Sequence, residues 1–79
     1  MSDKKILIYT LPTCHFCQLA KEYFKEKGVL YEEKDVSRDE AAQQEMIDKS
    51  GAFATPVIDI GGKIIIGFRK EEIEEALEA

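Results

Sequence analysis

Two cysteines separated by two residues, Cys14 and Cys17, lie where an apolar strand pattern gives way to a helical one. Residues Lys5–Tyr9 are typical of a short strand, and the apolar side chains after Cys17 recur at helical spacing: Leu19, Ala20, Tyr23 and Phe24. The chain must therefore end a strand, turn and begin a helix at the cysteines. The first thiol then meets unpaired backbone N–H groups and the positive end of the helix dipole.

Both effects favour the thiolate, which is the reactive form of cysteine, so the pair predicts reversible thiol–disulfide chemistry. We expect Cys14 to be the nucleophile and Cys17 to attack the mixed disulfide formed at Cys14. A disulfide between residues three apart closes too small a loop to stabilise the fold usefully. The pair is also compatible with a reducing compartment, where lasting disulfides are rare. A buried structural cysteine is the alternative for Cys14.

The remaining patterns predict one domain over residues 1–79. Strands are expected at 4–10, 29–36, 56–60 and 63–66, the last two joined by a Gly61-Gly62 turn. Helices are expected at 14–27, ending at Gly28, then from the capping box Ser37-x-x-Glu40 to residue 50, and at 70–77. The first unit requires parallel strands with a right-handed crossover, and the hairpin requires an antiparallel pair. The prediction is an α/β fold, a four-stranded mixed sheet covered by helices.

Within the two later helices, periodicity identifies the side chains that should be buried. These are Ala41, Met46 and Ile47 in the second helix and Ile73, Ala76 and Leu77 in the third.

Composition narrows the functional classes. With 11 basic and 16 acidic residues and a formal charge of −5, the chain has no basic footprint for nucleic acid. The N-terminal apolar run is too short for a signal sequence or a membrane span. We therefore expect a cytoplasmic monomer that binds neither nucleic acid nor membrane.

Three stretches together resemble the glutaredoxin-like branch of the thioredoxin superfamily. They are Tyr9–Lys21 around the cysteines, Ala54-Thr55-Pro56, and Ile66–Arg69. The resemblance spans essentially the whole chain and implies a thioredoxin fold in the minimal βαβ-α-ββ-α arrangement. It also implies a disulfide oxidoreductase that reduces protein or small-molecule disulfides, has disulfide-containing proteins as partners and binds no cofactor. Electrons would come from glutathione or from a thioredoxin reductase.

Four positions depart from the pattern of glutathione-using glutaredoxins. Those proteins carry a basic residue at the position of Leu11, and a Gly-Gly pair followed by aspartates where this chain has Gly67-Phe68 and Arg69-Lys70. Gly67-Phe68-Arg69 instead resembles small redoxins dedicated to ribonucleotide reductase, which take electrons from thioredoxin reductase. Those redoxins usually have a proline at the position of Lys70.

The resemblance also implies a substrate-binding surface formed by Thr55, Pro56, Gly67 and Phe68. A cis Thr55–Pro56 bond would present the Thr55 backbone to an extended substrate segment, whereas a simple strand-opening proline is the alternative. Gly67 would allow close backbone approach. Phe68, together with Phe53, would form an apolar rim, although either ring could instead be core.

Four residues near the cysteines are candidates for tuning their reactivity: Thr13, His15, Phe16 and Lys21. A cationic His15 or Lys21 would favour the thiolate, and a solvated side chain is the alternative for each. Phe16 is either an exposed contact for partner proteins or a packing residue at the helix start.

A metal site within one chain is not expected, because a closed zinc site needs four ligands and only Cys14, Cys17 and His15 are close in sequence. Two chains could pool four thiols around zinc or an iron–sulfur cluster. A dimeric metal or cluster carrier is therefore the alternative function, and a redox-inert interaction module ranks last.

Overall fold

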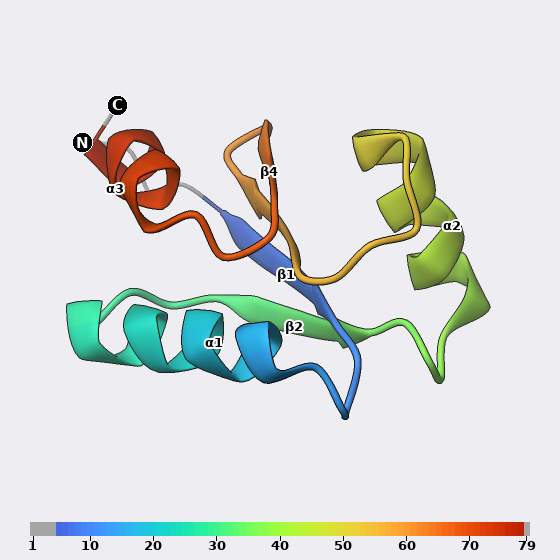
Figure 1. The fold of residues 1–79 in the computed structure, drawn as a ribbon. Helices are drawn as coiled ribbons and strands as arrows, with labels where there is room; N and C mark the ends of the chain where they lie inside the picture. The colour runs from blue at the N-terminus through green and yellow to red at the C-terminus, as the bar shows by residue number, and fades with distance from the viewer. Residues whose placement is uncertain (1–4, 79) are drawn as a thin grey trace.

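The computed structural model describes residues 5–78 and contains the predicted sequence of strands and helices (Figure 1). The elements are β1 (Ile6–Thr10), α1 (His15–Lys27), β2 (Glu32–Asp35), α2 (Glu40–Ser50), β3 (Val57–Ile60), β4 (Lys63–Ile66) and α3 (Lys70–Glu78). Lys4, where the first strand was expected to begin, lies outside the described residues.

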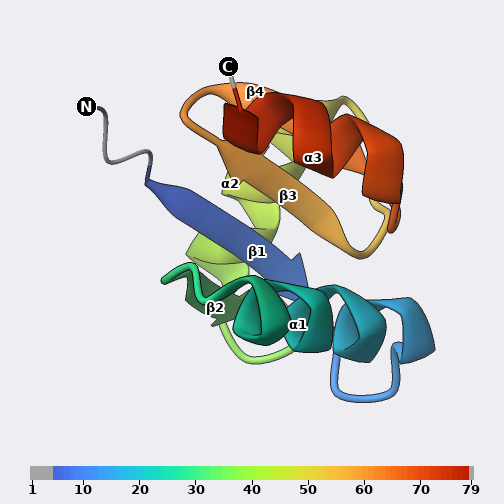
Figure 2. The same ribbon diagram turned by 90° about the vertical axis from the view of Figure 1, so that its left-hand side faces the viewer.

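The strands form one mixed sheet in the order β2-β1-β3-β4. β1 pairs with β2 in parallel and with β3 antiparallel, so that Ile8 lies between Glu33 and Ile58. β3 and β4 form the antiparallel hairpin. Helices α1 and α3 cover one face of the sheet and α2 covers the other (Figure 2). This is the predicted α/β arrangement.

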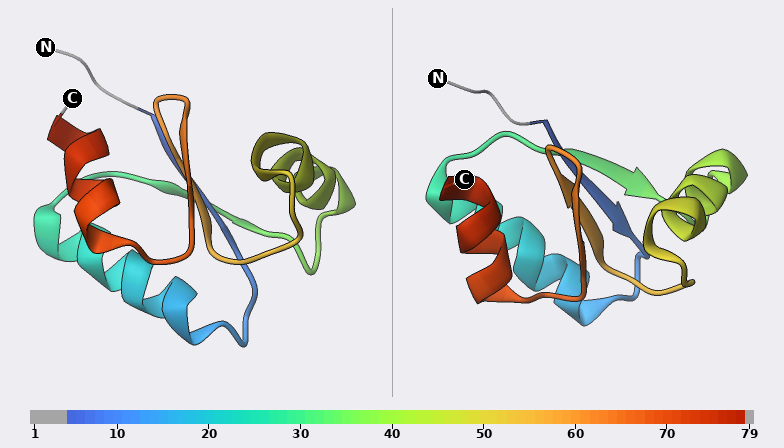
Figure 3. Two further views of the ribbon diagram at one scale, coloured as in Figure 1. Left: turned by 45° about the horizontal axis from the view of Figure 1, so that its top comes forward. Right: turned by 90° about the horizontal axis from the view of Figure 1, so that it is seen from above.

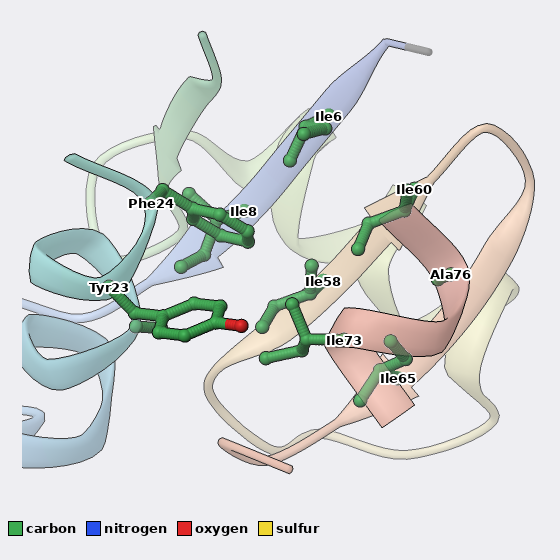
Figure 4. Packing of buried hydrophobic residues seen from close by; sticks show 10 residues of the cluster. Ile6, Ile8, Tyr23, Phe24, Ile58, Ile60, Ile65, Ile73 and Ala76 are labelled. Atoms are coloured by element: carbon green, nitrogen blue, oxygen red, sulfur yellow. The ribbon is translucent and has the colours of Figure 1, made fainter. Parts of the chain in front are cut away.

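Each face of the sheet has its own apolar core because β1 and β3 are buried on both sides. Ile6 and Ile8 point toward α1 and α3, where they meet side chains from β3 and both helices (Figure 4). Leu7 and Tyr9 alternate to the opposite face and pack under α2 with Met46. The central strand is thereby fixed in position, and its carboxyl end leads directly to the cysteines.

The predicted start of α2 was wrong. Asp39, not Ser37, is the N-cap: its carboxylate accepts the Ala42 N–H at 3.1 Å. Ser37 instead bonds to Asp35, which accepts both its hydroxyl, at 2.6 Å, and its amide, at 2.9 Å. The later start also corrects the buried set, since Ala42 is buried and Ala41 is exposed.

The connection after α1 is longer than predicted. Gly28 adopts φ +72°, a left-handed conformation that favours glycine, and its N–H caps the helix by donating to the Lys25 carbonyl at 3.1 Å. Residues 29–31 are irregular, so β2 begins at Glu32 rather than at Val29.

Among residues 5–78, no helix combines the length and apolar character needed to cross a bilayer.

Candidate active site

Cys14 lies at the end of the tight connection between β1 and α1. Its amide donates to the Leu11 carbonyl at 3.1 Å, and its extended backbone makes it the N-cap of α1. The Cys14 sulfur accepts the backbone N–H of Cys17 at 3.2 Å. Both cysteines are free thiols. The predicted position at a helix start is therefore confirmed.

The Cys14 thiol is partly exposed and has a pKa below that of an ordinary thiol. Burial acts to raise this pKa, but hydrogen bonds outweigh it. They come from the Cys17 and Thr55 side chains and from the amides of Cys17 and Phe16. Because these hydrogen bonds stabilise the thiolate, Cys14 is deprotonated more often than an ordinary cysteine. The thiolate is the species that attacks a disulfide.

The Cys17 thiol has the opposite character. Cys17 is 1% exposed, and its burial is the main cause that raises the pKa of its thiol to about 11. The hydrogen bond to Cys14 and the neighbouring charge of Cys14 act in the same direction. The two sulfurs thus differ in both access and acidity. Such a pair can react first through one sulfur and then through the other.

The segment before β3 and the β4–α3 connection lie at the end of the sheet where α1 begins (Figure 3). The Thr55–Pro56 bond is cis, as the resemblance implied. Gly67 donates its N–H to the Pro56 carbonyl at 2.8 Å and adopts φ +88°. A Cβ at Gly67 would meet no atom within 4 Å, so the backbone conformation rather than crowding within the chain requires glycine.

Three aromatic side chains near this end of the sheet differ in exposure. Phe16 is 58% exposed and Phe53 is 56% exposed, so the alternative that Phe53 belongs to the core is excluded. Phe68 is half-buried and packs edge-on against Tyr23, with ring centroids 5.9 Å apart. Phe68 therefore supports the core as well as bordering the loop.

The candidate tuning residues occupy different environments. Thr13 and His15 are exposed, and the His15 ring lies edge-on to Phe16 at 5.8 Å. Lys21 is half-buried and paired with Glu33 at 2.9 Å, which raises the Lys21 pKa. Glu33 was not expected near the site, because no local signal in the sequence joins residues twelve positions apart.

A groove of about 410 Å³ lies beside Cys14, which lines it. Pro12 and Thr13 border one end, and the helix side is formed by residues at helical spacing: His15, Gln18, Leu19 and Glu22. This groove was not predicted from the sequence. The helical spacing of these four residues was a signal in the sequence, but many solvated helix faces show the same spacing.

Within residues 5–78, no group of three or more His, Cys, Asp or Glu side chains is placed to hold a metal ion. A site shared between two chains is a separate question, and the dimeric carrier stays a prediction.

A mixed four-stranded sheet, a dithiol at the start of the first helix and a cis-proline segment beside it define a thiol–disulfide oxidoreductase of the thioredoxin fold. The chain belongs to the glutaredoxin family, whose profile matches residues 6–65.

Individual relatives support this assignment over most of the chain. A glutaredoxin-like 8.6 kDa protein in the rubredoxin operon of Clostridium pasteurianum is 41% identical over 73 residues, which is 92% of this chain and 97% of that one. Glutaredoxin 3 of Escherichia coli is 38% identical over 60 residues, covering 76% and 72% of the two chains. The structure of NrdH-redoxin from Escherichia coli, a glutaredoxin-like protein with a thioredoxin-like activity profile, superimposes with a TM-score of 0.80 at 30% identity. The match covers 90% of this chain and 92% of that one.

Proposed function

We propose that Cys14 and Cys17 reduce protein disulfides in two exchange steps. The Cys14 thiolate attacks one sulfur of the substrate disulfide, forms a mixed disulfide and releases the other substrate sulfur as a thiolate. Cys17 then loses its proton and attacks the Cys14 sulfur, which releases the second substrate thiolate. Two electrons pass from the dithiol to the substrate, and the two released thiolates take up protons.

The difference between the two sulfurs carries this proposal. Cys14 is reachable and has a lowered pKa, whereas Cys17 is 1% exposed and has a pKa of about 11. An external disulfide therefore meets Cys14 first. Cys17 reacts only once the Cys14 sulfur is held beside it in the mixed disulfide. The short distance between the two sulfurs, rather than a low pKa of Cys17, then makes the second step fast.

Thr55, Pro56, Gly67 and Phe68 form the substrate contact in this proposal. The Thr55 side chain acts to lower the pKa of both thiols, so Thr55 lies close to the reacting sulfurs. The Gly67–Pro56 hydrogen bond holds the two loops together at 2.8 Å. An extended substrate segment that pairs with this backbone would present its disulfide to Cys14.

We also propose that a thioredoxin reductase supplies the electrons. In this proposal the protein is a monomeric carrier in the cytoplasm. NrdH-redoxin, with its thioredoxin-like activity profile, resembles this chain over nearly its whole length. Arg69 and Lys70 stand where the aspartates of glutathione-using proteins stand, and two cations there would repel the glutathione ammonium group.

The test uses two coupled assays that follow NADPH loss, one with glutathione and its reductase and one with thioredoxin reductase. Turnover with thioredoxin reductase and little with glutathione is expected, and the reverse would overturn the choice of electron source. A Cys14→Ser variant should be inactive in both. A Cys17→Ser variant should accumulate a mixed disulfide visible by intact mass, and full turnover of a protein disulfide by that variant would exclude the dithiol cycle.

A further inference from the structure

The groove beside Cys14 is separate from the surface at Thr55 and Pro56. It is lined by outward-facing residues of α1, and neither Cys17 nor Thr55 contributes to it. Cys14 is the one thiol that borders it. A chain whose sulfur has reached Cys14 can thus extend in this direction as well as toward the cis-proline segment.

The groove has the length of a short peptide segment. Glu22 follows Cys14 by eight positions in the sequence, which corresponds to about 12 Å along α1. An extended chain advances about 3.4 Å per residue. A residue three or four positions from the reacting cysteine of a substrate therefore reaches Glu22.

The chemistry changes along the groove from neutral to anionic. Leu19 is half-buried and offers an apolar surface, and Gln18 offers an amide. Glu22 is exposed and forms no ion pair with any other residue between 5 and 78. A free carboxylate at the far end favours a cationic group there, and the charge of −5 on the whole chain attracts a basic segment from a distance.

We propose that this groove binds the extended protein segment next to the reactive cysteine of a substrate, and that Glu22 selects a lysine or arginine three or four residues from that cysteine. The inference rests on the proposed attack by Cys14. It adds a specificity determinant on α1 to the contacts at Thr55 and Gly67.

The experiment uses the fully reduced protein and synthetic peptides, each with one cysteine held as a mixed disulfide with 2-thiopyridine. Attack on the peptide sulfur releases 2-thiopyridone, whose absorbance reports the first exchange step without any reductase. The peptides carry Lys, Gln or Glu at the third or fourth position on either side of the cysteine. Second-order rate constants are compared at low and at high salt.

We expect the Lys peptide to react about threefold faster than the Gln peptide at low salt, the size of effect that one exposed ion pair gives. The preference should vanish at high salt because exposed charges are screened. Glu22→Lys should reverse the order, so that the Glu peptide reacts fastest. Glu26→Lys is the matched control, since Glu26 is an exposed glutamate one turn further along α1 that does not line the groove.

An absence of preference in the natural protein, or an equal reversal by Glu26→Lys, would overturn the inference while leaving the thiol chemistry intact. The proposed function fails differently. In that case no peptide releases 2-thiopyridone at a rate above that of the Cys14→Ser variant, whatever its charge. Both glutamates are exposed, so neither substitution is expected to unfold the protein.

Discussion

The Lys21 ammonium lies 2.9 Å from Glu33 Oε2, and the same oxygen accepts the hydroxyl of Thr10 at 2.8 Å. Thr10 ends β1 just before the turn to Cys14, and Lys21 lies one helical turn after Cys17. Glu33 in β2 therefore joins the two segments that flank the dithiol.

Lys21→Met should make the protein more reducing. The change removes a cation that interacts electrostatically with Cys17, so a thiolate in the reduced state loses stabilisation. We expect the reduction potential to fall by on the order of 10 mV, since 30 mV corresponds to 1.4 kcal/mol and an exposed pair contributes less. Equilibration with a reference thiol pair measures the shift. Lys25→Met is the control, because Lys25 is exposed on the same helix, and an equal shift in both variants would contradict a local effect.

The two thiols should titrate in separate ranges. Alkylation by iodoacetamide, mapped by mass, should show Cys14 reacting with a midpoint below that of an ordinary thiol. Cys17 should stay protected until the pH approaches its pKa of about 11. Equal midpoints for the two residues would show that the burial difference has no effect on acidity.

The stability of the reduced protein should follow from the same shifts. The pKa of Cys17 is raised in the folded state, so its neutral thiol stabilises the fold below the ordinary thiol pKa. That contribution is lost as the pH rises toward about 11. The lowered pKa of Cys14 acts in the opposite sense, adding stability above its unfolded value. Urea unfolding of reduced wild type and Cys17→Ala across this range should show their difference shrinking as the pH rises.

Lys49→Met should destabilise the protein by about 2 kcal/mol, the cost of leaving a largely buried carboxylate without its cation. The Lys49 ammonium bonds Asp59 at 2.8 Å and the Tyr9 hydroxyl at 2.9 Å, and so holds α2 to β1 and β3. Tyr9 also bonds Glu45. Urea unfolding measures the loss. Lys63→Met, at an exposed lysine in β4, should change stability by less than about 0.5 kcal/mol, and equal losses would refute the role of this network.

Asp39→Ala should cost about 1 kcal/mol of stability, the usual value for losing an N-cap. Ser37→Ala should cost less, because Ser37 stabilises only the preceding turn through Asp35. Thermal unfolding of the two variants distinguishes the caps. A larger loss in Ser37→Ala would restore the capping box predicted from the sequence.

The order of elements and the placement of the cysteines could be predicted because local signals determine them. Strand and helix periodicities change at Cys14, and Gly28 ends α1 in the conformation that favours glycine. The start of α2 was mistaken because Ser37 and Asp39 both stand at capping distance from a helical pattern. Only the turn at Asp35, which engages Ser37, decides between them.

The surroundings of the site were less predictable because they depend on contacts between distant segments. Glu33 reaches Lys21 and Thr10 only through the parallel register of β1 and β2, which places Glu33 opposite Ile8. The exposure of Phe53 depends on how the loop before β3 leaves the sheet, and no periodicity constrains that loop.

The burial of Cys17 determines how the protein can meet its electron donor and its electron acceptor. With one reachable sulfur, donor and acceptor must both use the face that carries Cys14, and they cannot occupy it together. In the proposed cycle the protein therefore has to leave one partner before it can bind the next. Very tight binding to either partner would slow this cycle, so short-lived complexes suit it better than a lasting one.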